Sequence, residues 1–252
     1  MPLDETNTRR TGVIVGVLFI IATSFLFLGE VFYRSYLDAP DVLTIAAQYK
    51  TVILIGLLIE LICILAMPLI GAFIFPVLSR VSIGMALSYF FFRALEGIIL
   101  ITVALTNKLA LLSLSEAQVA GTELASAANT LALIRAQNFW ANTDGPLYNI
   151  IFALGAICLY GTLFHARLIP RWISVWGLIG IVILLILLGT AAVIPLPPMA
   201  QLVLIPIAVQ EMVMALWFIF RGFDFETVEA RSARTAEVSP EDGPNQKLDV
   251  LK

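Results

Sequence analysis

The chain has 252 residues, of which 60 % are hydrophobic and only 13 % are charged, and its formal net charge is −3. Soluble domains carry about 25 % charged residues, and a soluble chain this apolar could not cover its surface with polar groups. The composition excludes an ordinary soluble domain and indicates membrane lipid as the main partner, while the sequence has no basic patch with interleaved aromatic residues to suggest nucleic acid.

Long apolar runs are the dominant pattern along the chain. A helix needs about 20 mostly apolar residues to cross ~30 Å of hydrocarbon, and six runs meet or approach that length. They are Gly12–Tyr33, Val52–Val77, Ile83–Thr106, Leu147–Phe164, Trp172–Ile194 and Ala200–Phe220. A transmembrane β-barrel would show short segments of alternating hydrophobicity instead. We therefore predict an all-α polytopic bundle of six spans, with residues 1–223 as a single integral membrane domain.

The first run predicts an uncleaved signal-anchor. It continues through LFLGEVFY without a small-x-small cleavage site and exceeds the usual length of a signal-peptide core. Gly12 and Gly16 are spaced four residues apart on this run, which would allow another helix backbone to approach closely. The same pair is also compatible with the ordinary abundance of small residues in membrane helices.

The connections between runs differ in length. Ser79–Ser82 and His165–Arg171 are tight turns, so their flanking helices are expected to be antiparallel neighbours. Asn107–Pro146 is too long for a structureless loop, and within it Glu123–Trp140 predicts one external helix before the fourth span. From Asp224 the chain turns polar and acidic, and residues 224–252 are predicted to be a disordered cytoplasmic tail.

The distribution of lysine and arginine sets the expected orientation. With the N-terminus inside, eight basic residues fall on the cytoplasmic side and four on the opposite side, which favours two cytoplasmic termini. The cytoplasmic set is Arg9, Arg10, Arg80, Arg167, Arg171, Arg221, Arg231 and Arg234, and the opposite set is Arg34, Lys50, Lys108 and Arg135.

Charged residues inside the apolar runs are the candidate site. Arg93 and Glu96 stand in YFFFRALEG of the third run, with Glu60 in the second and Glu211 in the sixth. A charge at mid-bilayer costs about 2.5–3.5 kcal/mol, and the i, i+3 spacing lets Arg93 and Glu96 pair on one helix face. At 1.5 Å rise per residue, all four residues are expected at one depth in the membrane, slightly to the external side of the bilayer midplane. The pattern predicts one buried polar cluster.

This predicted cluster has three acids for one base. A buried carboxylate without a partner takes up a proton rather than staying ionised. The cluster therefore needs a protonated acid, a bound cation, water or a second base, for which Arg135 is the outside candidate. Tyr89 and Gln210 are placed to add hydrogen bonds. Two interpretations stay open: a site for a proton, small cation or polar head group, or a clamp that only holds the helices together.

The sequence predicts no metal site and no cofactor. Cys63 and Cys158 lie inside apolar runs, where cysteine behaves as a small hydrophobic residue, and His165 is the one histidine. Two separated cysteines and one histidine do not supply the usual zinc ligand set.

Several segments follow one another in a recognisable series: NTRRTG, LLIELICILAMPLIGAFIFPVL, FRALEGIIL, LIRAQNFW, FHARLIPRWISVWGLIG and IAVQEMVMALW. Together they resemble a bacterial family of multi-span membrane proteins catalogued as domain of unknown function 4386, over about residues 7–223. The run Arg167–Gly177 is the most specific piece. The resemblance implies a multi-pass protein of the bacterial cytoplasmic membrane and implies no activity.

Three classes of function follow from these observations. The favoured one is a non-enzymatic, transporter-like or sensor-like bundle built around the buried Glu/Arg site. The second is a structural or regulatory partner of another membrane protein, or a homo-oligomer, in which the charges only clamp the helices. The third is an intramembrane lipid-modifying enzyme, which the sequence disfavours because no span carries a nucleophile with its base or a metal motif.

Overall fold

The computed structural model describes residues 5–121, 127–191, 193–194, 202 and 205–224, and these residues form helices and turns without a strand. The helices are α1 (Glu5–Leu37), α2 (Val42–Gln48), α3 (Lys50–Leu78), α4 (Ile83–Ile99), the π-helix η1 (Leu100–Leu105), α5 (Thr106–Val119), α6 (Ala127–Ala141), α7 (Pro146–Ala166), α8 (Arg171–Ala191) and α9 (Ile205–Phe220). The all-α prediction is confirmed for this part of the chain. The predicted disordered tail lies almost wholly outside it.

Five helical stretches are long and apolar enough to cross a membrane. They are Thr6–Leu37, Lys50–Leu78, Ile83–Val119, Ala127–Ala166 and Arg171–Ala191. Helix α9 is also apolar but has 16 residues, and most of the residues that would precede it in the predicted sixth span are not described. The structure thus supports a multi-pass membrane protein, and the sixth span remains a prediction.

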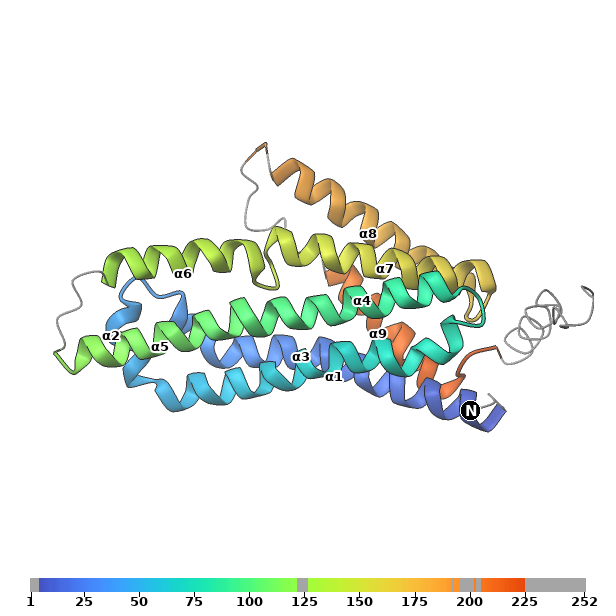
Figure 1. Ribbon diagram of the computed structural model, residues 1–252, viewed down its shortest axis with the longest axis horizontal. Coiled ribbons are helices and arrows are strands. Elements are labelled where there is room, and N and C mark those ends of the chain that lie inside the picture. Colours follow the sequence, from blue (N-terminus) through green and yellow to red (C-terminus); the bar gives the residue numbers. More distant parts are fainter. Residues whose placement is uncertain (1–4, 122–126, 192, 195–201, 203–204, 225–252) are drawn as a thin grey trace, which may run out of the picture.

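The long helices pack as a ring that follows chain order. Helix α1 packs against α3, α3 against α4, α4 against α7, α7 against α8, α8 against α9, and α9 returns to α1. Figure 1 shows α1, α3, α4 and α7 running lengthwise and α8 and α9 running obliquely to them, with α2, α5 and α6 gathered at one end of the molecule. A ring of this kind encloses an interior that all of its members share.

The contact between α1 and α9 closes the ring through the Gly12/Gly16 pair. A Cβ atom on Gly16 would lie 2.5 Å from the carbonyl oxygen of Ala215, so only glycine permits this approach. The Arg9 guanidinium donates hydrogen bonds to the carbonyl oxygens of Ile219 (2.5 Å) and Phe220 (3.0 Å). These carbonyls end α9 and have no partner within their helix. The beginning of α1 and the end of α9 therefore lie at the same end of the bundle.

The third helix is longer than its apolar run. We expected it to end at Thr106, with an external segment from Asn107, but Ile83–Val119 is one continuous helical stretch of 37 residues with η1 in its middle. The polar residues after Thr106 do not end the helix, because neighbouring helices satisfy them: the Asn107 amide donates to Asn138 of α6 at 3.1 Å. The chain turns only at Gly121, which has a φ of +76°. The predicted helix Glu123–Trp140 corresponds to α6, and its external location remains a prediction.

The two short turns are closely specified by the sequence. The Ser82 hydroxyl caps α4 by accepting from the Met85 N–H at 3.3 Å. Helix α7 ends at Arg167, which adopts the left-handed conformation with a φ of 57°. The Leu168 N–H donates to the Leu163 carbonyl at 3.2 Å, as in a Schellman motif. A left-handed conformation costs a residue other than glycine about 1–2 kcal/mol. The backbone conformation of Arg167 therefore lowers the stability of the fold by about this amount.

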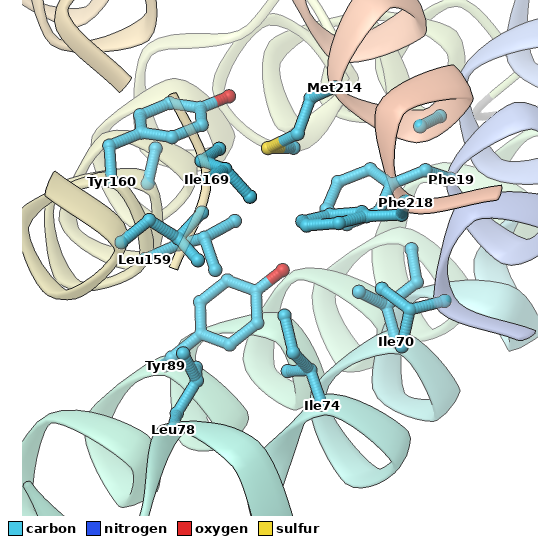
Figure 2. Close-up of a cluster of buried hydrophobic side chains, with 14 of the residues drawn as sticks. Phe19, Ile70, Ile74, Leu78, Tyr89, Leu159, Tyr160, Ile169, Met214 and Phe218 are labelled. Atoms are coloured by element: carbon cyan, nitrogen blue, oxygen red, sulfur yellow. The ribbon is translucent and has the colours of Figure 1, made fainter. Parts of the chain in front are cut away.

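Within the described residues, two clusters of buried apolar side chains fill the bundle, and one of them draws on every helix of the ring. Figure 2 shows Phe19 of α1, Ile70 of α3, Leu159 of α7 and Met214 of α9 converging on one another. The hydroxyl groups of Tyr89 and Tyr160 point into this interior (Figure 2). Apolar side chains also cover the outside, as in Leu58, Ile186 and Phe220, which suits a surface in contact with lipid.

Candidate functional site

Arg93 and Glu96 of α4 form an ion pair inside the ring. The Arg93 Nη1 lies 2.7 Å from the Glu96 Oε2, and the two residues are 5 % and 0 % exposed. Their i, i+3 spacing puts both side chains on the face that α4 turns to the interior. Gly155 of α7 lets this face of α4 approach closely, because a Cβ there would lie 3.1 Å from the Phe92 Cβ. The pairing expected from the sequence is present.

A small cavity adjoins this ion pair. Its volume is about 10 Å³, and the residues with polar groups in its lining are Tyr89, Arg93, Glu96, Tyr160 and Glu211. A cavity needs about 10–15 Å³ of this kind of volume to hold one water molecule. The rest of the lining is apolar and includes Phe19. The space is therefore the size of a single water and lies beside two carboxylates and one guanidinium.

Two polar atoms around the cavity have no partner among the described residues. They are the Tyr89 hydroxyl oxygen and the Arg93 Nε, both fully buried. The Glu96 carboxylate, in contrast, also has the Tyr148 hydroxyl of α7 as a hydrogen-bonding neighbour. Proteins leave few buried polar atoms unsatisfied, because each one costs about 1–3 kcal/mol. Donors and acceptors that gather around a water-sized space point to a small hydrogen-bonding occupant.

Glu211 reaches the same cavity from α9. Its Oε2 accepts a hydrogen bond from the Thr23 hydroxyl of α1 at 2.9 Å. Within the described part of the chain, no guanidinium or ammonium lies within 4 Å of this carboxylate. The cavity thus has one carboxylate that is paired with a base and one that is held only by a hydroxyl group.

Gln210 lies next to Glu211 in sequence, but its side chain bonds to α7 and α8. Its Oε1 accepts from the Tyr160 hydroxyl at 2.8 Å, and its Nε2 donates to the Ile173 carbonyl at 3.1 Å. These bonds join α7, α8 and α9 beside the cavity, and Gln210 itself does not line it. Its role is to fix the helix that carries Glu211.

Glu60 belongs to a different ion pair, which corrects the single cluster expected from the sequence. The Lys108 Nζ lies 2.6 Å from the Glu60 Oε1 and 3.1 Å from the Tyr33 hydroxyl. Glu60 is 0 % exposed and Lys108 is 4 % exposed. Lys108 is therefore a second base of the kind that three acids and one base called for. We had expected it outside the spans, because the apolar run ends before Lys108, but the helix continues and carries it against α3. The signal in the sequence was the lack of glycine and proline between residues 98 and 120.

Arg135 is not the second base that we expected. It is exposed on α6 and lines a separate cavity of about 720 Å³, together with Glu30, Arg34 and Lys108. The buried charges thus divide into the Glu60–Lys108 pair and a cluster that we call the Arg93 cluster, which comprises Tyr89, Arg93, Glu96 and Glu211.

The chemistry open to the Arg93 cluster follows from its size and charge. The described residues contain no group of three or more His, Cys, Asp or Glu side chains that could hold a metal ion. A polar head group needs a site of several hundred Å³, far larger than this cavity. What remains is the binding of a water molecule, a proton or a compact cation between two carboxylates and a guanidinium.

Comparison with known proteins places the chain in a family. No curated protein and no solved structure matches it. Residues 14–222 match the family described as "Domain of unknown function (DUF4386)". Because this match covers most of the 252 residues, the chain belongs to that family, as the resemblance of its motifs indicated.

Proposed function

We propose that the protein is a non-enzymatic membrane protein with a transporter-like or sensor-like role, in which the Arg93 cluster binds and releases a proton. The observation that carries this proposal is the arrangement of two carboxylates and one guanidinium around a water-sized cavity with unpartnered buried polar atoms. Intramembrane ionisable residues of this kind commonly mark ion or proton pathways.

Charge balance favours a proton over the other small ligands. Arg93 compensates one carboxylate, and two carboxylates so close together in an apolar interior cannot both stay ionised cheaply. One added proton makes the cluster neutral. A metal cation would lie beside the Arg93 guanidinium, which repels it, and a head group exceeds the cavity. The proton is the one ligand of the three that both the charge and the volume suit.

The competing proposal is that the cluster only clamps the helices. Polar contacts between membrane helices contribute about 0.6 kcal/mol each and up to ~1.7 kcal/mol, so Arg93, Glu96 and Glu211 could serve stability alone. In that case the protein would act as a structural or regulatory partner, or as a homo-oligomer. The paired Glu60–Lys108 site fits a clamp well, because its charges balance. The unbalanced Arg93 cluster fits it less well.

The proposed location is the bacterial cytoplasmic membrane with both chain ends inside. The apolar helices support a membrane location, and the excess of arginine and lysine on the side of the N-terminus supports the orientation. The ring geometry agrees with it, since α1 begins where α9 ends.

An infrared pH titration of the protein in lipid nanodiscs tests the proton site. A protonated carboxyl group in an apolar setting absorbs at higher frequency than one in water, so we expect a high-frequency carboxyl band that changes with pH. Glu211→Gln should remove or weaken this band, whereas Glu116→Gln, at a surface pair with Lys50, should leave it unchanged. If the band of the wild-type protein does not change with pH, the result would favour the proposal that the cluster only holds the helices together.

A further inference from the structure

A third cavity, distinct from the two described above, opens at the end of the bundle where α7 and α9 end and α8 begins. Its volume is about 630 Å³, which is within the range of sites for small molecules and lipid head groups. Three arginines line it, Arg167, Arg171 and Arg221, against one acidic residue, Asp224. We call this cavity the arginine pocket.

The three guanidinium groups are available to an anion. Among the described residues, none of them lies within 4 Å of a carboxylate, and all three residues are exposed. Arg171 lies over the ring of Phe164 at 5.0 Å, which orients its side chain without neutralising its charge. Guanidinium groups bind phosphate with two parallel hydrogen bonds, which gives this residue type its preference for phosphate ligands.

The backbone around the pocket adds to its positive potential. Helix α8 has 21 residues and begins at Arg171, with Leu168, Ile169 and Pro170 also in the lining. The free N–H groups and the dipole at a helix N-terminus favour an anion there. Arg167 occupies a left-handed position that glycine would adopt without strain. A strained backbone that carries a charged side chain into a cavity is typical of a functional position.

The surroundings of the pocket indicate the source of the anion. Trp172, at the start of α8, is 54 % exposed and stacks with Trp176 at 6.4 Å between ring centroids. Exposed tryptophan at a helix end is characteristic of the level of the lipid head groups. Trp217 also lines the pocket. The pocket is on the side with the excess of basic residues, where the membrane surface carries anionic lipid.

We propose that the arginine pocket binds the phosphate group of an anionic phospholipid head group, through Arg167, Arg171 and Arg221. The proposal is independent of the proton site, because the two sites share no lining residue. The bound lipid would hold together the α7–α8 turn and the end of α9.

The test measures thermal unfolding of the full chain in micelles that contain either phosphatidylglycerol or phosphatidylcholine. We expect the unfolding temperature to be higher with phosphatidylglycerol. Arg167→Gly should keep or raise the unfolding temperature in phosphatidylcholine, because it relieves the left-handed strain, yet weaken phosphatidylglycerol binding about tenfold or more. The triple change of Arg167, Arg171 and Arg221 to Gln should abolish the difference between the two lipids.

Arg10→Gln is the matched control, because Arg10 is an exposed arginine at the same end of the bundle and outside the pocket. It should retain the full effect of phosphatidylglycerol. An equal loss in Arg10→Gln, or an unchanged lipid effect in the triple variant, would overturn the proposal. Inorganic phosphate is the second arm: if it alone stabilises the wild-type protein in phosphatidylcholine and Arg167→Gly removes that effect, a free phosphate compound is the ligand and the lipid assignment is wrong.

Discussion

The Lys108 ammonium lies 2.6 Å from the Glu60 carboxylate, although the two residues are 48 positions apart and belong to α5 and α3. Both are buried, so each charge depends on the other for compensation. Breaking a buried pair from one side is far more costly than replacing both partners by apolar residues. This asymmetry gives the first prediction.

Lys108→Met should destabilise the protein by about 3–5 kcal/mol, because it leaves Glu60 uncompensated. The double variant Glu60→Leu/Lys108→Met should recover most of that loss. Thermal unfolding of purified protein in detergent measures both. If the double variant is as unstable as Lys108→Met alone, then the pair contributes more than mutual charge compensation.

The Arg93 cluster predicts a different pattern. Arg93→Leu should lower stability at neutral pH by about 3–5 kcal/mol, since Glu96 and Glu211 then face one cavity without a base. Arg93→Leu/Glu96→Leu/Glu211→Leu removes every charge from the cavity and should restore stability. If the triple variant inserts stably but loses the pH-dependent carboxyl band, the cluster serves proton binding rather than assembly. Retention of the band in the triple variant would assign it to another carboxyl group.

Closure of the ring depends on the glycine contact between α1 and α9. Gly16→Ala should destabilise the bundle by about 1–3 kcal/mol, because the new methyl group overlaps the Ala215 carbonyl oxygen. Gly189→Ala in α8 is the control: a Cβ there meets no atom within 4 Å, so the change should be neutral or stabilising by up to about 1 kcal/mol. Equal effects of the two substitutions in thermal unfolding would contradict the role given to the α1–α9 contact.

Reporter fusions test the predicted topology. Fusions after Pro40 and Gly121 should report the external side, and fusions after Arg80, Arg167 and Arg221 should report the cytoplasm. The fusion point after the third span is Gly121, because the helix continues past Lys108 to Val119. An external signal after Arg221 would overturn the prediction that both chain ends are inside.

The helix series could be predicted because burial in lipid demands long apolar runs, and their limits mostly agree with the observed helices. The true end of the third helix could not be predicted in this way. The apolar run ends at Thr106, where the surroundings of the helix change, whereas the helix itself ends only near Gly121, which allows a left-handed turn. The Arg93–Glu96 pair follows from spacing within one helix. The pairing of Glu60 with Lys108 depends on the register between α3 and α5, and the cavity beside Glu211 depends on side-chain rotamers, and neither is encoded in spacing along one helix.

The ring in chain order has a consequence for biogenesis. Five of the six contacts of the ring join helices that follow one another in the ring along the chain, so each can form once the later helix of the pair has been synthesised. The remaining contact is between α1 and α9: the Gly12/Gly16 face of α1 and Arg9 meet α9 only when translation is nearly finished. Until then the face of α1 that contacts α9 is unpacked, and the Arg93 cluster lacks the carboxylate of Glu211. A chain that stalls before α9 therefore leaves the glycine face of α1 uncovered and the ring open.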